Sequence, residues 1–198
     1  MKRMMGMMRL ASVPVLTAGL LLGLAAIPGA QARESLPPPP VVAAQGTIQS
    51  AFAPWDDIEA LIVSQLDSAR RQILVQAYLL TSRPITDALV AARKRGIDVR
   101  VLMDGGQLDK NANDRLRQLR GAGIPVWLET AYRNAHNKVI VIDASLASAT
   151  VITGSYNFTW SAQHKNAENI LVLGKNPPLA ARYAANWQRH RQDAEAAP

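Results

Sequence analysis

The sequence has 198 residues, no cysteine and a formal net charge of +7 at pH 7. This length is enough for one domain with a sizeable hydrophobic core beside a processed segment. The lack of cysteine excludes a disulfide framework, a zinc site built on thiolates and lipid modification of cysteine.

The N-terminal segment has the pattern of a secretory signal peptide. Three basic residues, Lys2, Arg3 and Arg9, precede an apolar region and a small-residue cleavage site that ends at Ala32. An uncleaved membrane anchor is the alternative, but the apolar run is short for a span and is interrupted by polar residues, proline and glycine. We therefore predict a signal peptide over residues 1–32 and a periplasmic or secreted protein.

The mature chain keeps a modest basic excess. From Arg33 onward there are 19 Lys and Arg against 15 Asp and Glu, which leaves a charge of +4. Such an excess favours polyanionic partners through counterion release, but it is also common in proteins that bind none. Charge alone therefore leaves nucleic-acid binding open.

Residues 33–46 are predicted to form a proline-rich linker. They contain four successive prolines, Pro37 to Pro40, and few residues that can pack in a core. Such a segment is typical of an extended tether. The alternative is a ligand for a proline-binding domain.

The folded domain is predicted over residues 47–194. Strand patterns and amphipathic helix patterns alternate in its first part with short links, which indicates an α/β sheet with right-handed parallel crossovers. The expected strands cover residues 47–52, 72–80, 98–103 and 124–128, and the expected helices cover residues 54–70, 84–95 and 112–120. Three strand patterns and a helix follow, at residues 139–142, 150–154, 168–173 and 178–191. The predicted fold class is α/β, with a mixed, largely parallel sheet flanked by helices on both faces of a single domain.

The strand pattern at residues 139–142 carries the most chemistry. His136 and Lys138 precede it two residues apart, so their side chains project to the same side of an extended segment. This pair combines a potential nucleophile or proton shuttle with a fixed positive charge. Asp143 follows the strand on the opposite parity, which favours a structural, hydrogen-bonding role for it.

A second polar cluster follows the strand pattern at residues 150–154. Ser155 and Asn157 lie two residues apart, and Glu168 begins the next strand pattern. A carboxylate that accepts from one imidazole nitrogen fixes the tautomer of the ring, and Lys138, Ser155 and Asn157 offer donors for a phosphoryl or acyl oxyanion. Each feature alone has an ordinary explanation, because Ser-x-Asn is common in turns and single glutamates are usually solvated.

Taken together, these residues resemble a known family. His136-x-Lys138 with Asp143, then Gly154-Ser155-x-Asn157-Phe158 and Glu168-Asn169, is similar to the HKD motif of the phospholipase D superfamily. Upstream, the residues from Ala77 to Val101 resemble the N-terminal half of the small secreted bacterial endonucleases of that superfamily, which have one motif per chain. The one departure is the stretch of residues 144–149, which is slightly long and is expected to form a surface loop.

The resemblance implies a phospholipase D-like fold and a two-step phosphodiester hydrolysis without metal or cofactor. It implies that His136 attacks phosphorus to form a phosphohistidine, with Lys138 and Asn157 binding phosphate oxygens and Ser155 in support. Glu168 is expected to orient a histidine. Because the chain has one motif where the chemistry needs two histidines, a homodimer with its active site at the two-fold interface is the expected partner arrangement.

Two other histidines are weighed against His136. His164, in a polar segment, is expected to be exposed or to face substrate, and it is the competing acid within one chain. His190, flanked by Arg189 and Arg191, is expected at the surface. A metal site is not expected, because Lys is a poor ligand and no acidic or histidine cluster has suitable spacing.

The leading hypothesis for function is a nonspecific endonuclease that hydrolyses DNA, with RNA as a further substrate. A phospholipase D that hydrolyses or transfers phosphatidyl groups is the first alternative. Against it, the mature chain has no long apolar interfacial helix, its tryptophans are scattered, and no stable membrane insertion is expected once the signal peptide is removed. A noncatalytic nucleic-acid-binding module is the other alternative, and the intact motif residues argue against it.

Overall fold

A computed structural model describes residues 38–198 of the chain. Residues 41–198 form one compact unit, and residues 38–40, which belong to the preceding unit, are exposed and without regular structure. The predicted signal peptide and the first residues of the predicted linker lie outside the described residues. Within residues 38–198, no helix combines the length and the apolarity that crossing a membrane requires.

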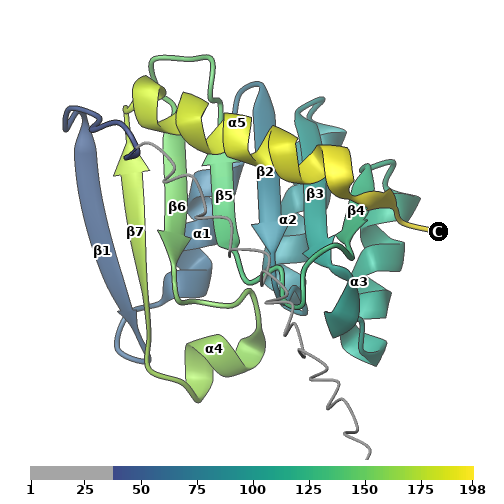
Figure 1. The fold of residues 1–198 in the computed structure, drawn as a ribbon. Coiled ribbons are helices and arrows are strands. Elements are labelled where there is room, and N and C mark those ends of the chain that lie inside the picture. The colour runs from purple at the N-terminus through teal and green to yellow at the C-terminus, as the bar shows by residue number, and fades with distance from the viewer. Residues whose placement is uncertain (1–37) are drawn as a thin grey trace, which may run out of the picture. The chain divides into compact units, whose positions relative to one another are not determined.

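The compact unit is built on a single eight-stranded sheet with the strand order β1-β7-β6-β5-β2-β3-β4-β8 (Figure 1). In chain order the strands are β1 Thr47–Ala53, β2 Gln72–Ala77, β3 Asp98–Asp104, β4 Val126–Glu129, β5 Lys138–Ile142, β6 Thr150–Gly154, β7 Glu168–Gly174 and β8 Glu195–Ala196. The strands that were expected are all present, and β8, a two-residue strand at one edge, was not expected.

The predicted α/β class, the mixed sheet and the helices on both faces are confirmed, but the expectation of a largely parallel sheet is wrong. Only β2–β3 and β3–β4 pair in parallel. The other five pairings in the described sheet are antiparallel. The physical reason lies in the connections, because parallel neighbours need a crossover of about a dozen residues or more. Only residues 143–149 join β5 to β6, which allows an antiparallel return and no crossover.

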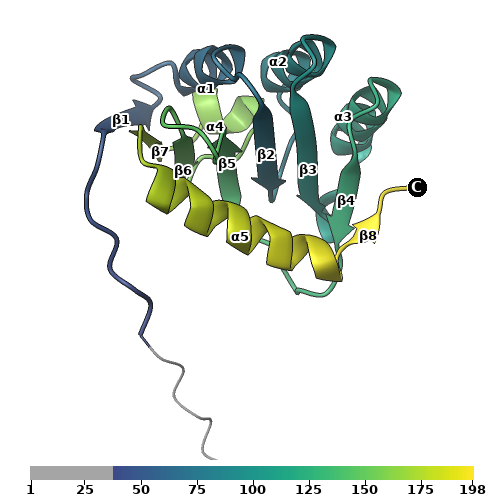
Figure 2. The ribbon, with the colours of Figure 1, turned by 90° about the horizontal axis from the view of Figure 1, so that it is seen from above.

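Helices cover the two faces unequally (Figure 2). On one face lie α1 Ile58–Asp67, α2 Arg83–Lys94 and α3 Lys110–Gly121, and on the other lies the long α5 Pro177–Asp193. A short α4, Trp160–His164, follows β6, and a 3-10 turn covers Gly105–Gln107. The sequence pattern did not predict α4, because five residues are too few to display helical periodicity.

Local capping determines where the helices begin. The Asp57 carboxylate accepts from the Ala60 N–H, so α1 starts at Ile58 and not at residue 54 as expected. The buried face of α1 consists of Ile58, Ile62 and Leu66. In α2 the Ser82 hydroxyl accepts from the Ile85 N–H, so α2 starts at Arg83.

Two apolar layers result, one on each side of the sheet. The larger layer lies under α1, α2 and α3, and the smaller one lies under α5 around the fully buried Trp187. The Trp187 indole N–H donates to the Val75 carbonyl at 2.8 Å, which fixes α5 on strand β2.

One edge of the sheet collects the polar residues of interest, and we call it the site edge (the lower edge in Figure 1). The strands β1, β2, β3, β4 and β6 end there, and β5 and β7 begin there. Strand register aligns the residues that define this edge: Ala53, Ala77, Asp104, Glu129, Lys138, Gly154 and Glu168.

Candidate active site

His136 lies two residues before the start of β5 at the site edge, and it is exposed. Its imidazole packs against the ring of Tyr78, which follows β2, with the ring centroids 4.3 Å apart and tilted by 53°. The Tyr78 N–H donates to the Asn137 carbonyl at 2.9 Å. Strand β2 therefore supports the imidazole both through the backbone and through an aromatic ring, while the imidazole stays open to solvent.

Lys138 is the first residue of β5 and is only 6% exposed. Its ammonium lies 3.0 Å from His136 Nδ1 and donates to the His136 carbonyl at 2.8 Å. It also lies 4.8 Å from the centroid of the Tyr78 ring. Burial lowers the pKa of Lys138, and the attraction of Glu168 opposes that shift. The structure thus places a desolvated cation beside the imidazole, as the sequence predicted.

Gly154 ends β6 where the chain turns toward this pair. A Cβ atom at this position would overlap the Asn169 carbonyl oxygen of β7, so the close approach of the two strands requires glycine. The next residue, Ser155, donates from Oγ to Glu168 Oε2 at 2.5 Å and accepts from the Asn169 N–H at 3.1 Å. Ser155 is therefore held by β7.

Asn157 lies two residues farther on, between two buried aromatic residues, Tyr156 and Phe158. The backbone of Phe158 is bound by the segment after β2, because it donates to the Leu79 carbonyl and accepts from the N–H groups of Thr81 and Ser82. This brings Asn157 to the same end of β2 as Tyr78. The Asn157 Oδ1 atom is buried and has no hydrogen-bond partner among the described residues. A buried amide without a partner is rare in a folded protein, and a bound ligand is one way of satisfying it.

Glu168 begins β7 and accepts from Ser155 and, through Oε1, from the Asn166 amide at 2.9 Å. Within residues 38–198 of one protomer, it has no hydrogen bond to a histidine. The structure therefore places Glu168 in the same cluster, close enough to influence Lys138, but it does not show the expected bond that orients an imidazole.

Asp143, which belongs to the same motif, is not part of this cluster. It follows β5 at the opposite end of that strand, and its carboxylate accepts from the backbone N–H groups of Arg70, Arg71 and Gln72 at 2.9, 2.7 and 2.9 Å. It is 2% exposed and has a φ of 53°. These contacts attach the start of β2 to the end of β5, far from the site edge.

The other two histidines differ from each other. His164 ends α4, is exposed, and lies 4.8 Å from the Trp160 ring between centroids. The expectation that His190 lies at the surface is wrong, because its side chain is 17% exposed and Nδ1 lies 2.6 Å from the buried Glu129 carboxylate. The flanking arginines misled the prediction, since one side of a helix can be buried while the residues before and after point to solvent.

Two further residues at the site edge were not assigned a role from the sequence. Tyr78 is the ring under His136, and Asp104 accepts from the Ala135 N–H beside it. Tyr78 lies within the predicted strand at residues 72–80, and Asp104 directly follows the predicted strand at residues 98–103. Their contacts with His136 and Ala135 join residues far apart in the chain, so spacing could not identify them.

This arrangement suits the handling of a phosphate group. The Lys138 ammonium, the Asn157 amide and the Ser155 hydroxyl provide donors, and the exposed imidazole next to them is a nucleophile or a proton carrier. The cluster comes from the ends of β2, β5, β6 and β7, which are neighbours in the sheet. Rigid strands therefore hold the groups in place.

Comparison with known proteins agrees with this chemistry. A family model described as the PLD-like domain of cardiolipin synthase matches residues 62–191. Phospholipase D of Rickettsia prowazekii (strain Madrid E) is 39% identical over 143 residues, which cover 72% of this chain and 67% of that protein. The mitochondrial cardiolipin hydrolase of Chlamydomonas reinhardtii is 29% identical over 124 residues, covering 63% of this chain and 53% of that protein.

Solved structures show the same relationship. Nuc from Salmonella typhimurium, a phospholipase D family member, superposes with a TM-score of 0.73 at 34% identity, covering 76% of this chain and 97% of that chain. NucT from Helicobacter pylori shares the fold, with a TM-score of 0.62 at 20% identity. The family model spans more than half of the sequence and includes the whole cluster around His136. The chain therefore belongs to the phospholipase D superfamily and is a phosphodiesterase of that superfamily.

Proposed function

We propose that the protein is a nonspecific endonuclease that cleaves DNA, and RNA as a further substrate, through a phosphohistidine intermediate and without a metal ion. The observation that carries the proposal is the similarity to Nuc, which covers 97% of that chain at 34% identity. The exposed His136 beside the buried Lys138 ammonium supports the chemistry. An open site at the edge of a sheet is accessible to a polymer.

In the first step, the Nε2 lone pair of His136 attacks phosphorus, and the bond from phosphorus to the leaving oxygen breaks. Lys138 and Asn157 stabilise the charge on the other phosphate oxygens, with Ser155 in support. The leaving oxygen takes a proton from a second imidazole. In the second step that imidazole removes a proton from water, the water oxygen bonds to phosphorus, and the bond to Nε2 breaks.

The contact between Lys138 and His136 determines which nitrogen is available before substrate binds. An ammonium that donates to Nδ1 leaves the proton of the neutral ring on Nε2. Attack through Nε2 therefore requires Lys138 to release Nδ1, so that the ring proton moves there through solvent. A bound phosphate supplies the stronger acceptor that draws the ammonium away.

The second imidazole is proposed to be His136 of a second protomer, in a homodimer with the site at the two-fold interface. Support comes from the single motif in the chain and from the exposure of His136 and His164, neither of which hydrogen-bonds to Glu168 within one protomer. In that dimer, Glu168 has access to an imidazole from across the interface.

Mixing wild type with His136→Ala protein tests this dimer. After subunit exchange, activity should fall with the square of the wild-type fraction, because a mixed dimer lacks one of its two imidazoles. A linear fall would contradict the shared site, and so would a fully active monomer in sedimentation.

Nucleic acid is the proposed substrate because two exposed cations lie next to the cluster. Arg133 is in the loop that leads to His136, and Lys165 follows α4, with its ammonium 5.6 Å from the centroid of the Trp160 ring. Such cations contact phosphates without reading bases, so cleavage should show weak sequence preference.

The deciding experiment assays the purified protein in EDTA on plasmid DNA, on RNA and on phosphatidylcholine vesicles, with His136→Ala as the control. We expect wild type to cut DNA and His136→Ala to be inactive on every substrate. Activity that EDTA abolishes and Mg²⁺ restores would contradict the metal-independent mechanism.

A phospholipase D activity is the second candidate, and two observations favour it. The Rickettsia relative carries that name, and two exposed tryptophans, Trp55 at 82% and Trp160 at 57%, lie in segments at the site edge. Exposed indoles are well suited to a lipid–water interface. Release of choline from vesicles with DNA left intact would support this activity in place of the nuclease.

Export through a cleaved signal peptide is also proposed, from the pattern of residues 1–32 alone. Intact-mass measurement of protein recovered from the periplasm or medium should show a chain that begins at Arg33. A mass that includes Met1 would contradict cleavage.

A further inference from the structure

The loop of residues 130–137, which we call the His136 loop, runs along the site edge from the end of β4 to the start of β5. It passes the ends of β3 and β2 and is bound at each. The Ala135 N–H donates to Asp104 Oδ2 at 2.5 Å at the end of β3, and the Asn137 carbonyl accepts from the Tyr78 N–H at 2.9 Å after β2. These two bonds lie directly on either side of His136.

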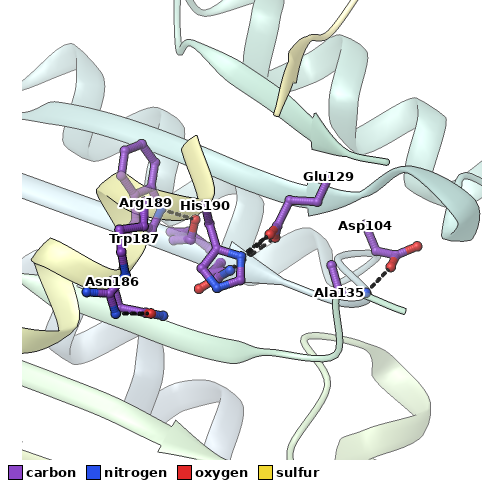
Figure 3. Close-up of polar contacts among 9 residues, drawn as sticks. Asp104, Glu129, Ala135, Asn186, Trp187, Arg189 and His190 are labelled. Atoms are coloured by element: carbon purple, nitrogen blue, oxygen red, sulfur yellow. Dashed lines mark hydrogen bonds and ion pairs between the residues drawn. The ribbon is translucent and has the colours of Figure 1, made fainter. Parts of the chain in front are cut away.

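A further contact of the His136 loop is made by the ring of Tyr132, whose centroid lies 5.2 Å from that of His190 on α5. The other side of this imidazole is fixed, because Nδ1 lies 2.6 Å from Glu129 Oε1 (Figure 3). Both carboxylate oxygens of Glu129 also accept from Gln76 Nε2, at 3.2 and 3.1 Å. The His190 ring therefore has little freedom to turn.

The part of α5 that carries His190 is also fixed in position. Trp187, one turn earlier on α5, is 1% exposed and is hydrogen-bonded to β2. Figure 3 shows the Glu129–His190 pair and the Asp104–Ala135 bond near each other. The loop is thus clamped between the helix on one face of the sheet and the strand end at its edge.

Stability alone does not explain this arrangement. Glu129 is 1% exposed, and a buried carboxylate paired with histidine contributes little net stability compared with a well-packed apolar pair. The pair holds the His190 ring in one orientation, and the exposed Tyr132 ring packs against it.

We propose that His190, held by Glu129, is a positioning residue that acts through Tyr132 on the His136 loop. The proposal rests on the proposed hydrolysis of phosphodiesters at His136. His190 does not touch the substrate. Because Tyr132 is four residues before His136, freeing its ring lets the backbone at Ala135 and His136 move, and in-line attack on phosphorus is sensitive to displacements of this kind.

Kinetics on bis(p-nitrophenyl) phosphate test the proposal with Tyr132→Ala and with Tyr132→Phe as the matched control that keeps the ring. We expect Tyr132→Ala to lower kcat by about tenfold to 10²-fold with little change in KM. Tyr132→Phe should retain wild-type kcat. A rise in KM at constant kcat would overturn the proposal, because it would make Tyr132 a substrate contact.

A double-mutant cycle tests the route through His190. His190→Ala alone would leave the buried Glu129 carboxylate without its partner. The cycle therefore uses the double replacement His190→Leu/Glu129→Gln, which removes both ionisable groups together. Its effect on kcat should not add to that of Tyr132→Ala, because both changes remove the same contact between the Tyr132 and His190 rings. Full additivity of the two effects would overturn the proposal.

Amide hydrogen exchange at Ala135 gives a readout that does not depend on activity. We expect exchange about tenfold faster in Tyr132→Ala and in the His190→Leu/Glu129→Gln pair, and unchanged in Tyr132→Phe. Unchanged exchange at Ala135 in both altered proteins would overturn the clamp. If wild type cleaves no phosphodiester, the proposed function fails, while this measurement still decides whether the loop is positioned as inferred.

Discussion

Lys138 combines a functional requirement with a cost to the fold. The residue is 6% exposed in a sheet edge formed largely of apolar strands, and burial lowers the pKa of its ammonium below the ordinary value of 10.5. Between the folded pKa and 10.5, the unfolded chain binds the proton that the folded protein has released, so the free energy of unfolding rises with pH in that window. Below the folded pKa, the cost of the buried ammonium is present in full.

Replacing Lys138 should therefore separate stability from activity. We expect Lys138→Met to stabilise the protein by about 1 kcal/mol. That corresponds to a rise in Tm of roughly 2–4 °C. The loss of a phosphate ligand should lower kcat/KM by about 10²–10³-fold. Thermal unfolding at pH 7 checks the first result, with the exposed Lys94→Met as the control, and a lower Tm for Lys138→Met would show that the ammonium stabilises the fold.

Asp143 should behave in the opposite way. Asp143→Ala leaves three backbone N–H groups without their acceptor, and each such loss costs about 1–3 kcal/mol when the group is buried. We expect a strong drop in Tm but a near-normal kcat at a temperature where the variant is folded.

Asp143→Asn is the conservative control, because its amide oxygen still accepts and asparagine tolerates the positive φ of this position. A folded Asp143→Ala protein with no activity would assign Asp143 to the chemistry after all.

The sequence predicted the residues whose signal is local. His136, Lys138, Ser155, Asn157 and Glu168 lie within short motifs, and the family they indicated is confirmed. It did not predict pairs such as His190 with Glu129, which lie 61 positions apart. Such pairs form only because the folded chain brings distant residues together, and no local pattern in a single sequence shows which distant residues will meet.

At the scale of elements, α5 determines how the second face of the sheet is covered. It packs across β6, β5, β2 and β4, and Trp187 is its anchor, with the Trp127 ring edge-on at 5.9 Å between centroids. The helix itself was predicted correctly, over residues 178–191. Its position across the sheet was not, because periodicity shows which side of a helix is buried but not what that side contacts.

Removing the anchor hydrogen bond should weaken α5 selectively. Trp187→Phe keeps most of the buried ring but removes the hydrogen bond to the Val75 carbonyl, which should cost about 0.5–1.5 kcal/mol. Thermal unfolding measures this cost, and Trp160→Phe at an exposed position is the matched control. Equal Tm values for the two variants would mean that Trp187 does not anchor the helix.

At the scale of the whole molecule, a basic residue contributes to substrate binding only where it lies near the site. Lys94, near the end of α2, and Arg133, next to His136, are both exposed, but only Arg133 is at the site edge. A plot of log kcat/KM for DNA against log salt concentration distinguishes them, because each lost phosphate contact reduces the slope by about 1.

We expect Arg133→Gln and Lys165→Gln each to flatten that slope between about 50 mM and 200 mM salt, with weaker cleavage at the lower concentration. Lys94→Gln, which keeps the same net charge as either variant, should behave as wild type. Equal effects from all three would mean that the protein responds to total charge and not to contacts at the site.

The pairing of β1 with β7 has a consequence for when the enzyme becomes active. Thr47, the first residue of β1, is opposite Gly174 of β7, so the first strand of the domain has no partner until nearly the whole chain is available. Pairings over such long separations form slowly, and a chain emerging from the ribosome delivers β7 late. Glu168 and the support for Ser155 come from that same strand. A chain that is still being synthesised therefore has no complete site, so catalysis begins only after its last strands have emerged.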